Sequence, residues 1–390
     1  MNIKPQDTTK RNKILTFILA IVNLVVLLFI FFSYKYDNTF LFLIEFIGLF
    51  ILSFIISTTI HELGHLLFGL ALGYKFVYFQ SLFLSISKRE GKFKFRIGLS
   101  KLLGQCLLSF DKDIDDMNFS YYLYGGSIFN LSLFIASFLH FILGFALYDN
   151  FHIFSLILAL INFSLYLNNG IALNSGGIYN DTLNIKLMRE NKAYRYAIFN
   201  QLKIEELIHN SKLINEFDED LLNNQSYSIP YNIPNGFIFI LLRTMKKVEN
   251  KENDPFEEIK CVHNYISYYP KMYRRSIYML LLYHNLINDI GYKWIISIKE
   301  NQNITKSKTF SDPILVLNRS LIAYKENALS KDEVIENINK TKKVIDSNTF
   351  SKVEKEFYQN LNNLTLEYLL YKELEGKTYE NESSNWSRYY

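Results

Sequence analysis

The stretch STTIHELGHLLFG, residues 57–69, places two histidines and a glutamate inside a long apolar run. The residues on both sides are almost all apolar, so the segment has the composition of a membrane-spanning helix. Ionisable side chains are costly within the hydrocarbon core, and for that reason they usually mark a functional site. His61, Glu62 and His65 are therefore the starting point for both the fold and the function of this chain.

Four segments in the first half of the chain are long and apolar enough to cross a bilayer, which takes about 20 helical residues. They cover residues 14–34, 40–72, 122–147 and 151–167. The first is too long for the apolar region of a signal peptide, and no small-x-small cleavage site follows it. We therefore expect four permanent spans.

Lysines and arginines near these spans form three groups, at residues 4–13, 88–101 and 186–192. Because cationic loops remain on the cytoplasmic side, all three groups lie on that side only if both termini are cytoplasmic. The pattern predicts an all-α, multi-pass protein of the cell membrane that contacts the lipid bilayer. Its expected parts are an N-terminal segment with the first span (1–39), a membrane core (40–189) and a cytoplasmic helical domain with a repeat-like series of helices (190–390).

Composition excludes other classes of protein. The formal net charge of +4 is too small and too dispersed to indicate a nucleic-acid partner. The two cysteines, Cys106 and Cys261, lie far apart and have no CxxC partner. We therefore expect two free thiols, and neither a disulfide framework nor a thiolate metal site.

His61 and His65 are four residues apart, so on a helix they lie on one face, one turn apart. Two imidazole nitrogens at that spacing can reach one metal ion. Glu62 is offset by about 100° around the helix, where it can reach a water in the open position of the ion. This H-E-x-x-H arrangement predicts two ligands and a general base for metal-assisted hydrolysis, with zinc as the ion. The alternative is a pair of buried histidines that pack between helices.

Catalytic zinc usually takes three protein ligands and leaves a fourth position for water. The other five histidines fit poorly, because they lie near the outer ends of the spans or in the tail. The stretch NNGIALNSGGIYNDT, residues 168–182, is rich in helix-breaking residues, and Asp181 then opens a new apolar-periodic segment. Asp181 is the expected third ligand. The alternative is that Asn180 or Asp181 only caps the next helix.

Three motifs resemble those of the site-2 protease family, the intramembrane zinc metalloproteases. HELGH at 61–65 is similar to the zinc motif of that family, and GGSIFNL at 125–131 to its glycine-rich motif with an asparagine. NFSLYLNNGIALNSGGIYNDT at 162–182 resembles its third-helix motif, in which an Asn and a Pro precede an Asp-Gly pair. The resemblance covers roughly residues 40–190.

The resemblance implies roles for individual residues of this chain. It assigns zinc binding to His61, His65 and Asp181, the general base to Glu62, and substrate binding to Asn162 (or, with a poorer fit, Asn168) and Asn130. The chain also departs from the family pattern. Leu165 stands at the position of the usual proline of the third motif, Thr182 at that of its glycine, and Ser127 at that of a proline in the middle motif.

Residues 74–99 alternate between polar and apolar side chains, with a turn at REG, and therefore predict a membrane-associated β-hairpin. An exposed strand beside a protease site can bind an unwound substrate by strand addition. The alternative is a ribbon on the cytoplasmic leaflet whose lysines face anionic lipid.

The tail contains GFIFILLR and RSIYMLLLYH, which are too short to cross a bilayer and too apolar for an exposed surface. We expect both to be core helices of a domain that either docks a substrate or protein partner or gives structural support. The leading hypothesis is an intramembrane zinc metalloprotease that cleaves a membrane-anchored protein or a secreted-peptide precursor, as in regulated intramembrane proteolysis. The second is a degenerate scaffold or peptide-immunity protein that acts through its tail. A transporter has little support, since inverted repeats are not recognisable.

Overall fold

The computed structural model describes residues 39–89, 91–99, 104–111, 114–147, 151–175, 178–223, 236–266, 269, 271–296, 312–346 and 350–386, with scattered positions between 14 and 28. The predicted first span, residues 14–34, lies outside the described residues apart from those positions. The chain divides into two compact units, Met1–Asn210 and Ser211–Tyr390.

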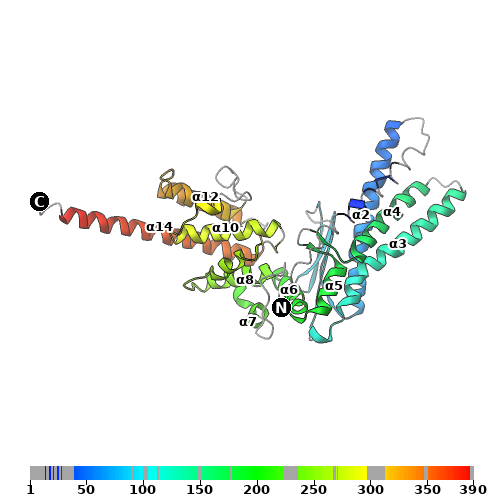
Figure 1. The fold of residues 1–390 in the computed structure, drawn as a ribbon, viewed down its shortest axis with the longest axis horizontal. Coiled ribbons are helices and arrows are strands. Elements are labelled where there is room, and N and C mark those ends of the chain that lie inside the picture. The colour runs from blue at the N-terminus through cyan, green and yellow to red at the C-terminus, as the bar shows by residue number, and fades with distance from the viewer. Residues whose placement is uncertain are drawn as a thin grey trace. The chain divides into compact units, whose positions relative to one another are not determined.

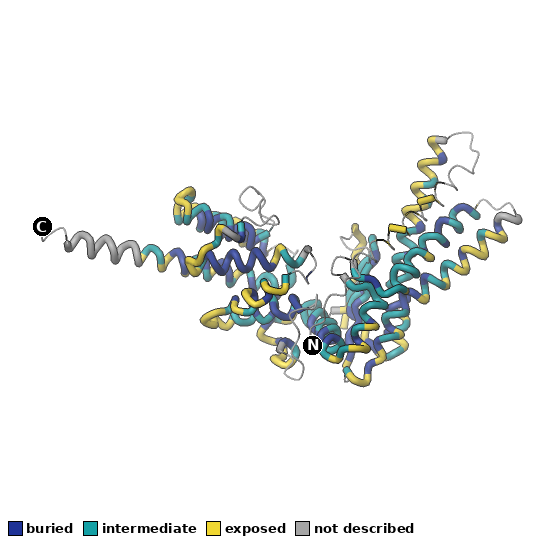
Figure 2. Tube along the Cα trace, in the orientation of Figure 1, coloured by how far each residue is buried: buried dark blue, intermediate teal, exposed yellow. Residues whose placement is uncertain are grey.

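Three long apolar helices dominate the first unit: α2 (Thr39–Ala71), α3 (Phe119–Leu147) and α4 (His152–Gly170). Within the described residues, these three have the length and composition needed to cross a membrane. They correspond to the second, third and fourth predicted spans and run side by side (Figure 1). Many residues of these helices are exposed (yellow in Figure 2). They include large apolar side chains such as Phe40, Ile51 and Leu143, which suit contact with lipid.

Helices α2 and α3 approach each other most closely where Gly64 faces Gly125. A Cβ atom on Gly64 would come within 2.3 Å of the Gly125 carbonyl oxygen, so the backbones themselves are in contact there. Small residues permit this kind of close packing between membrane helices. The contact lies next to His61 and His65 and brings α3 up to the histidine-bearing face of α2.

An antiparallel sheet follows α2. Its strands are β1 (Lys75–Ser81), β2 (Leu84–Arg89), β3 (Lys92–Ile97) and β4 (Gly104–Ser109), in the order β3-β2-β1-β4. The predicted hairpin is present as β2 and β3, with Gly91 at φ 78° in the turn. The sheet is larger than this predicted hairpin, because β1 and β4 add two further strands to it. Most of β1 is at least partly buried between β2 and β4, so the alternation of polar and apolar residues is weaker in β1 than in β2 and β3.

The first unit ends with short elements that return to α2. A 3-10 turn, η1 (Ile114–Asp116), precedes α3, and a two-stranded ribbon, β5 (Asn174–Ser175) and β6 (Ile178–Tyr179), follows α4. Helices α5 (Asp181–Glu190) and α6 (Lys192–His209) complete the unit, so α6 belongs with the apolar helices although we expected the tail to begin at residue 190.

Within its described residues, the second unit contains helices joined by turns and loops, and no strands. Its elements are η2 (Ile214–Glu216), α7 (Glu219–Asn223), α8 (Gly236–Glu249), α9 (Glu257–His263), α10 (Lys271–Ile287), α11 (Lys293–Ile296), α12 (Pro313–Lys325), α13 (Lys331–Asp346) and α14 (Lys352–Trp386). The two apolar stretches predicted as core helices are α8 and α10, and Phe239 and Tyr283 from them are fully buried. This unit therefore has a hydrophobic core of its own.

Candidate metal centre

Three side chains from distant parts of the sequence converge beside the contact of α2 with α3. The Nε2 atoms of His61 and His65 are 3.2 Å apart. The Oδ2 atom of Asp181 lies 3.4 Å from the first and 3.5 Å from the second. These three ligand atoms form a nearly equilateral triangle that can hold one metal ion. They belong to the three residues that the sequence predicts as ligands.

Both imidazole rings are oriented through their other nitrogen. His61 Nδ1 lies 2.6 Å from Asn130 Oδ1, and His65 Nδ1 lies 3.0 Å from the carbonyl oxygen of Tyr122. Both partners are oxygens that only accept, so each Nδ1 carries the proton, a tautomer assigned from its partners. In the neutral ring, each Nε2 therefore keeps its lone pair and directs it toward Asp181.

Asp181 is held in place by the loop that follows α4. Asn180 caps α5, since its side chain accepts a hydrogen bond from Leu183 N at 3.1 Å, and it also donates to the Ile171 carbonyl oxygen at 2.6 Å. The capping role that sequence analysis left open thus falls to Asn180, and Asp181 is free to point at the histidines. Its Oδ2 atom is buried and has no hydrogen-bond partner among the described residues.

The centre of this triangle needs positive charge. Two imidazole lone pairs and one carboxylate oxygen face one another, and none of the three brings a donor when the rings are neutral. Burial raises the pKa of the Asp181 carboxyl, but positive charge on the imidazoles of His65 and His61 lowers it by more, so the carboxyl group remains ionised. Either protons on the imidazoles or a metal cation can supply that charge.

Glu62 lies beside this triangle on α2 and faces β4. A Cβ atom on Gly104 would come within 2.7 Å of Glu62 Oε1, so the glycine leaves room for the carboxylate. Burial, followed by the charge of Glu62, raises the pKa of the Cys106 thiol. Cys106 and Cys261 are both free cysteines, as the sequence predicts.

The two asparagines expected to bind substrate lie behind His61. Asn130 and Asn162 are fully buried, and Asn130 Nδ2 donates to Asn162 Oδ1 at 2.8 Å. Asn162 Nδ2 donates to Ser57 Oγ at 2.7 Å. The carbonyl oxygen of Asn168, the other candidate, accepts a hydrogen bond from Asn180.

Sequence analysis missed several residues that shape the site: Ser57, Tyr122, Gly104 and Gly126. Ser57 lies one turn before His61, and this spacing in the sequence is the signal that places it on the same helix face. Gly126 leaves room for the His61 ring, because a Cβ atom there would come within 2.5 Å of its Cε1 atom. Tyr122 contributes a backbone carbonyl, which leaves no signal in side-chain chemistry.

Scans against protein-family models, curated proteins and solved structures returned no match. The likeness to site-2 proteases therefore depends on the three motifs and not on an overall similarity.

Proposed function

We propose that this chain is an intramembrane zinc metalloprotease of the site-2 type. The observation that carries the proposal is the convergence of His61 Nε2, His65 Nε2 and Asp181 Oδ2 beside Glu62, on a helix apolar enough to span a membrane. An H-E-x-x-H helix with a distant third ligand is an arrangement suited to metal-assisted hydrolysis.

The size of the triangle favours zinc. A tetrahedral ion with ligands at about 2.0–2.1 Å places neighbouring ligand atoms about 3.3 Å apart. The three observed separations are 3.2, 3.4 and 3.5 Å. An octahedral magnesium ion at a similar bond length would need adjacent ligands about 2.9 Å apart, and it prefers oxygen to imidazole. Two histidines and one carboxylate also leave a fourth tetrahedral position open for water.

Each residue of the site then has its own role in peptide hydrolysis. A zinc ion held by His61, His65 and Asp181 would lower the pKa of bound water and polarise the scissile carbonyl. Glu62 takes a proton from the attacking water while the water oxygen bonds to the acyl carbon. Glu62 then delivers that proton to the amine nitrogen as the C–N bond breaks. His61, His65 and Asp181 hold the centre in place throughout.

The departures from the family motif leave the ligands in place. Thr182, at the position of the family glycine, donates a hydrogen bond from its hydroxyl to the carbonyl oxygen of Asn169. This bond fixes the start of α5 against the end of α4, and with it Asp181. The departure at Thr182 is therefore compatible with an active centre.

The proposed setting is the cell membrane, with four spans and both termini in the cytoplasm. The predicted substrate is a membrane-anchored protein or a secreted-peptide precursor. Strand β3, exposed along its whole length with Phe95 and Ile97 on one face and cations on the other, suits either strand addition by substrate or contact with anionic lipid.

The test compares cells that produce the wild type with cells that produce Glu62→Gln. Glu45→Gln is the matched control, because it makes the same change at an exposed position of the same helix. Mass spectrometry of new protein ends should find cleavages within apolar segments in the wild-type and Glu45→Gln membranes. Identical sets of ends in the Glu62→Gln membranes would contradict the proposal.

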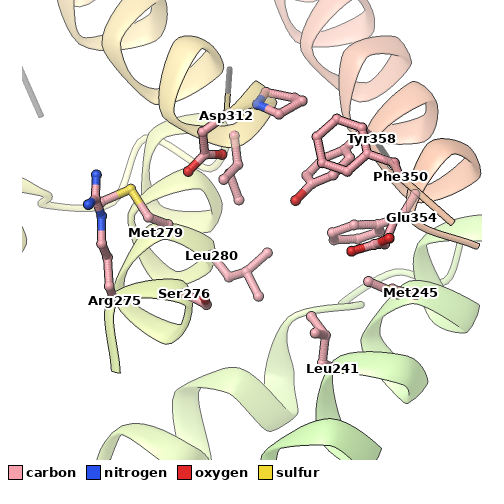
Figure 3. Close-up of a pocket in the computed structure, with 13 residues that line it drawn as sticks. Leu241, Met245, Arg275, Ser276, Met279, Leu280, Asp312, Phe350, Glu354 and Tyr358 are labelled. Atoms are coloured by element: carbon pink, nitrogen blue, oxygen red, sulfur yellow. The ribbon is translucent and has the colours of Figure 1, made fainter. Parts of the chain in front are cut away.

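A cavity in the second unit favours a second function, peptide binding by the tail. It has a volume of about 410 Å³ and lies among α8, α10, α14 and the start of α12 (Figure 3). Apolar side chains such as Met245, Met279 and Phe357 form much of its wall. Burial, then the charges of Asp312 and Glu354, raise the pKa of the Tyr358 hydroxyl that also lines it.

Two acidic side chains, Asp312 and Glu354, outnumber the one basic side chain, Arg275, in this lining, so the cavity suits a short apolar peptide that carries a basic group. Its volume lies within the range of about 300–1,000 Å³ for ligand sites. Methyl-labelled methionine spectra of the full chain can detect such binding at Met245 and Met279. The tripeptide Leu-Lys-Phe-amide should shift both signals at lower concentration than Leu-Glu-Phe-amide. Equal effects, or none, would refute this second function.

A further inference from the structure

The hydrogen bonds behind His61 form one continuous chain through α2, α3 and α4. His61 Nδ1 donates to Asn130 Oδ1 at 2.6 Å, and Asn130 Nδ2 donates to Asn162 Oδ1 at 2.8 Å. Asn162 Nδ2 donates to Ser57 Oγ at 2.7 Å, and Ser57 Oγ donates to the Ser53 carbonyl oxygen at 2.7 Å. The side chains of Asn130, Asn162 and Ser57 are fully buried.

Two backbone carbonyls determine the direction of this chain. Asn130 Nδ2 also donates to the Ser57 carbonyl oxygen at 3.1 Å, and Asn162 Nδ2 to the Leu158 carbonyl oxygen at 2.8 Å. If either amide were reversed, its oxygen would face a carbonyl oxygen, and two acceptors would be left without a proton. The Asn130 oxygen must therefore face His61, which requires the proton of that ring on Nδ1.

We infer that Asn130, Asn162 and Ser57 are positioning residues that fix the tautomer and the ring orientation of His61 for metal binding. Both hydrogens of each amide are already used within the protein, so neither asparagine retains an N–H for a substrate backbone. This assignment differs from the substrate-binding role that the family resemblance implies for them. It rests on the proposed zinc centre and adds three outer partners to it.

Zinc affinity of the full chain in lipid nanodiscs, measured by competition with a chelator, tests this role. Outer hydrogen-bond partners of a metal-binding histidine typically change metal affinity by about 10- to 100-fold. Asn130→Ala should weaken zinc binding by that factor, and Asn162→Ala and Ser57→Ala by less. Ser164→Ala is the matched control, since its hydroxyl bonds only the Leu160 carbonyl oxygen, at 2.8 Å, and should leave the affinity unchanged.

A rescue variant separates positioning from general damage to the fold. Asn130→Asp keeps an acceptor for His61 Nδ1, so it should bind zinc at least tenfold more tightly than Asn130→Ala. Nitrogen NMR of labelled histidine in the metal-free protein gives a readout independent of zinc and of activity. The His61 proton should be on Nδ1 in the wild type and distributed over both nitrogens in Asn130→Ala.

Two results would overturn the inference. One is a folded Asn130→Ala protein with wild-type zinc affinity and the wild-type His61 tautomer. The other is loss of substrate binding in that variant while its zinc affinity is unchanged. That result would assign Asn130 to substrate binding. Failure of the proposed function is a different outcome, because then the wild type itself would bind no zinc.

Discussion

Substitution of Gly126 by alanine should weaken zinc binding without unfolding the protein. The added Cβ atom would lie 2.5 Å from Cε1 of His61 and 2.7 Å from both ring nitrogens. Ordinary contacts begin at about 3.5 Å, so the ring must move by about 1 Å. A metal site tolerates only about 0.2 Å.

The magnitude follows from the cost of overpacking. Such insertions typically cost about 1–3 kcal/mol, which corresponds to about 5- to 140-fold weaker zinc binding at 1.4 kcal/mol for each factor of ten. The helix itself gains about 1 kcal/mol from replacing glycine by alanine. Unfolding of α3 is therefore not expected in this variant, and weaker zinc binding would come from the displaced His61 ring.

The assay is chelator competition on nanodisc-embedded protein, with circular dichroism as the check on folding. Gly48→Ala is the control, because it makes the same change in a membrane helix where a Cβ atom meets nothing within 4 Å. It should bind zinc like the wild type. If Gly126→Ala binds zinc as tightly as Gly48→Ala, the placement of His61 against α3 is wrong.

Four further expectations follow from the same geometry. Glu62→Gln should keep zinc but lose peptide hydrolysis, and zinc loss in this variant would make Glu62 a ligand. Gly104→Ala, whose Cβ would come within 2.7 Å of Glu62 Oε1, should lower kcat by about 100-fold with zinc retained; an unchanged kcat would argue against Glu62 as the base. Zinc affinity should fall as the pH is lowered from neutrality, because imidazoles must be neutral to ligate and protons compete with the metal; an affinity that does not change with pH would contradict histidine ligation. Phe239→Ala should destabilise the second unit by about 3–5 kcal/mol, since Phe239 is fully buried; it should leave zinc affinity unchanged, and a fall in both would couple the two units.

The parts of the fold that the sequence predicts are those with strong local patterns. Three predicted spans coincide with α2, α3 and α4 because about 20 consecutive apolar residues allow few other structures. The core helices α8 and α10 follow from short apolar runs in a charged tail. The β2–β3 hairpin follows from alternation and the turn at Gly91, whereas β1 and β4 are more buried and have no comparable pattern.

In the candidate site, too, the features with a local sequence pattern could be predicted, and those that depend on tertiary packing could not. The spacing of His61 and His65 and the helix break before Asp181 suffice to predict three atoms that meet within 3.5 Å. The hydrogen-bond chain through Asn130, Asn162 and Ser57 could not be predicted, because it depends on how three helices are rotated about their axes. Space left by Gly104 and Gly126 is likewise a tertiary property, visible only when the facing side chains are placed.

The most direct test of the account is the metal content of the full chain purified in detergent, beside His61→Ala and Asp181→Asn. The account predicts one zinc per chain in the wild type and none in either variant. If zinc is retained in Asp181→Asn but lost in His61→Ala, Asp181 is not the third ligand. No zinc in the wild type, under conditions where a control metalloprotease keeps its own, would contradict the central claim.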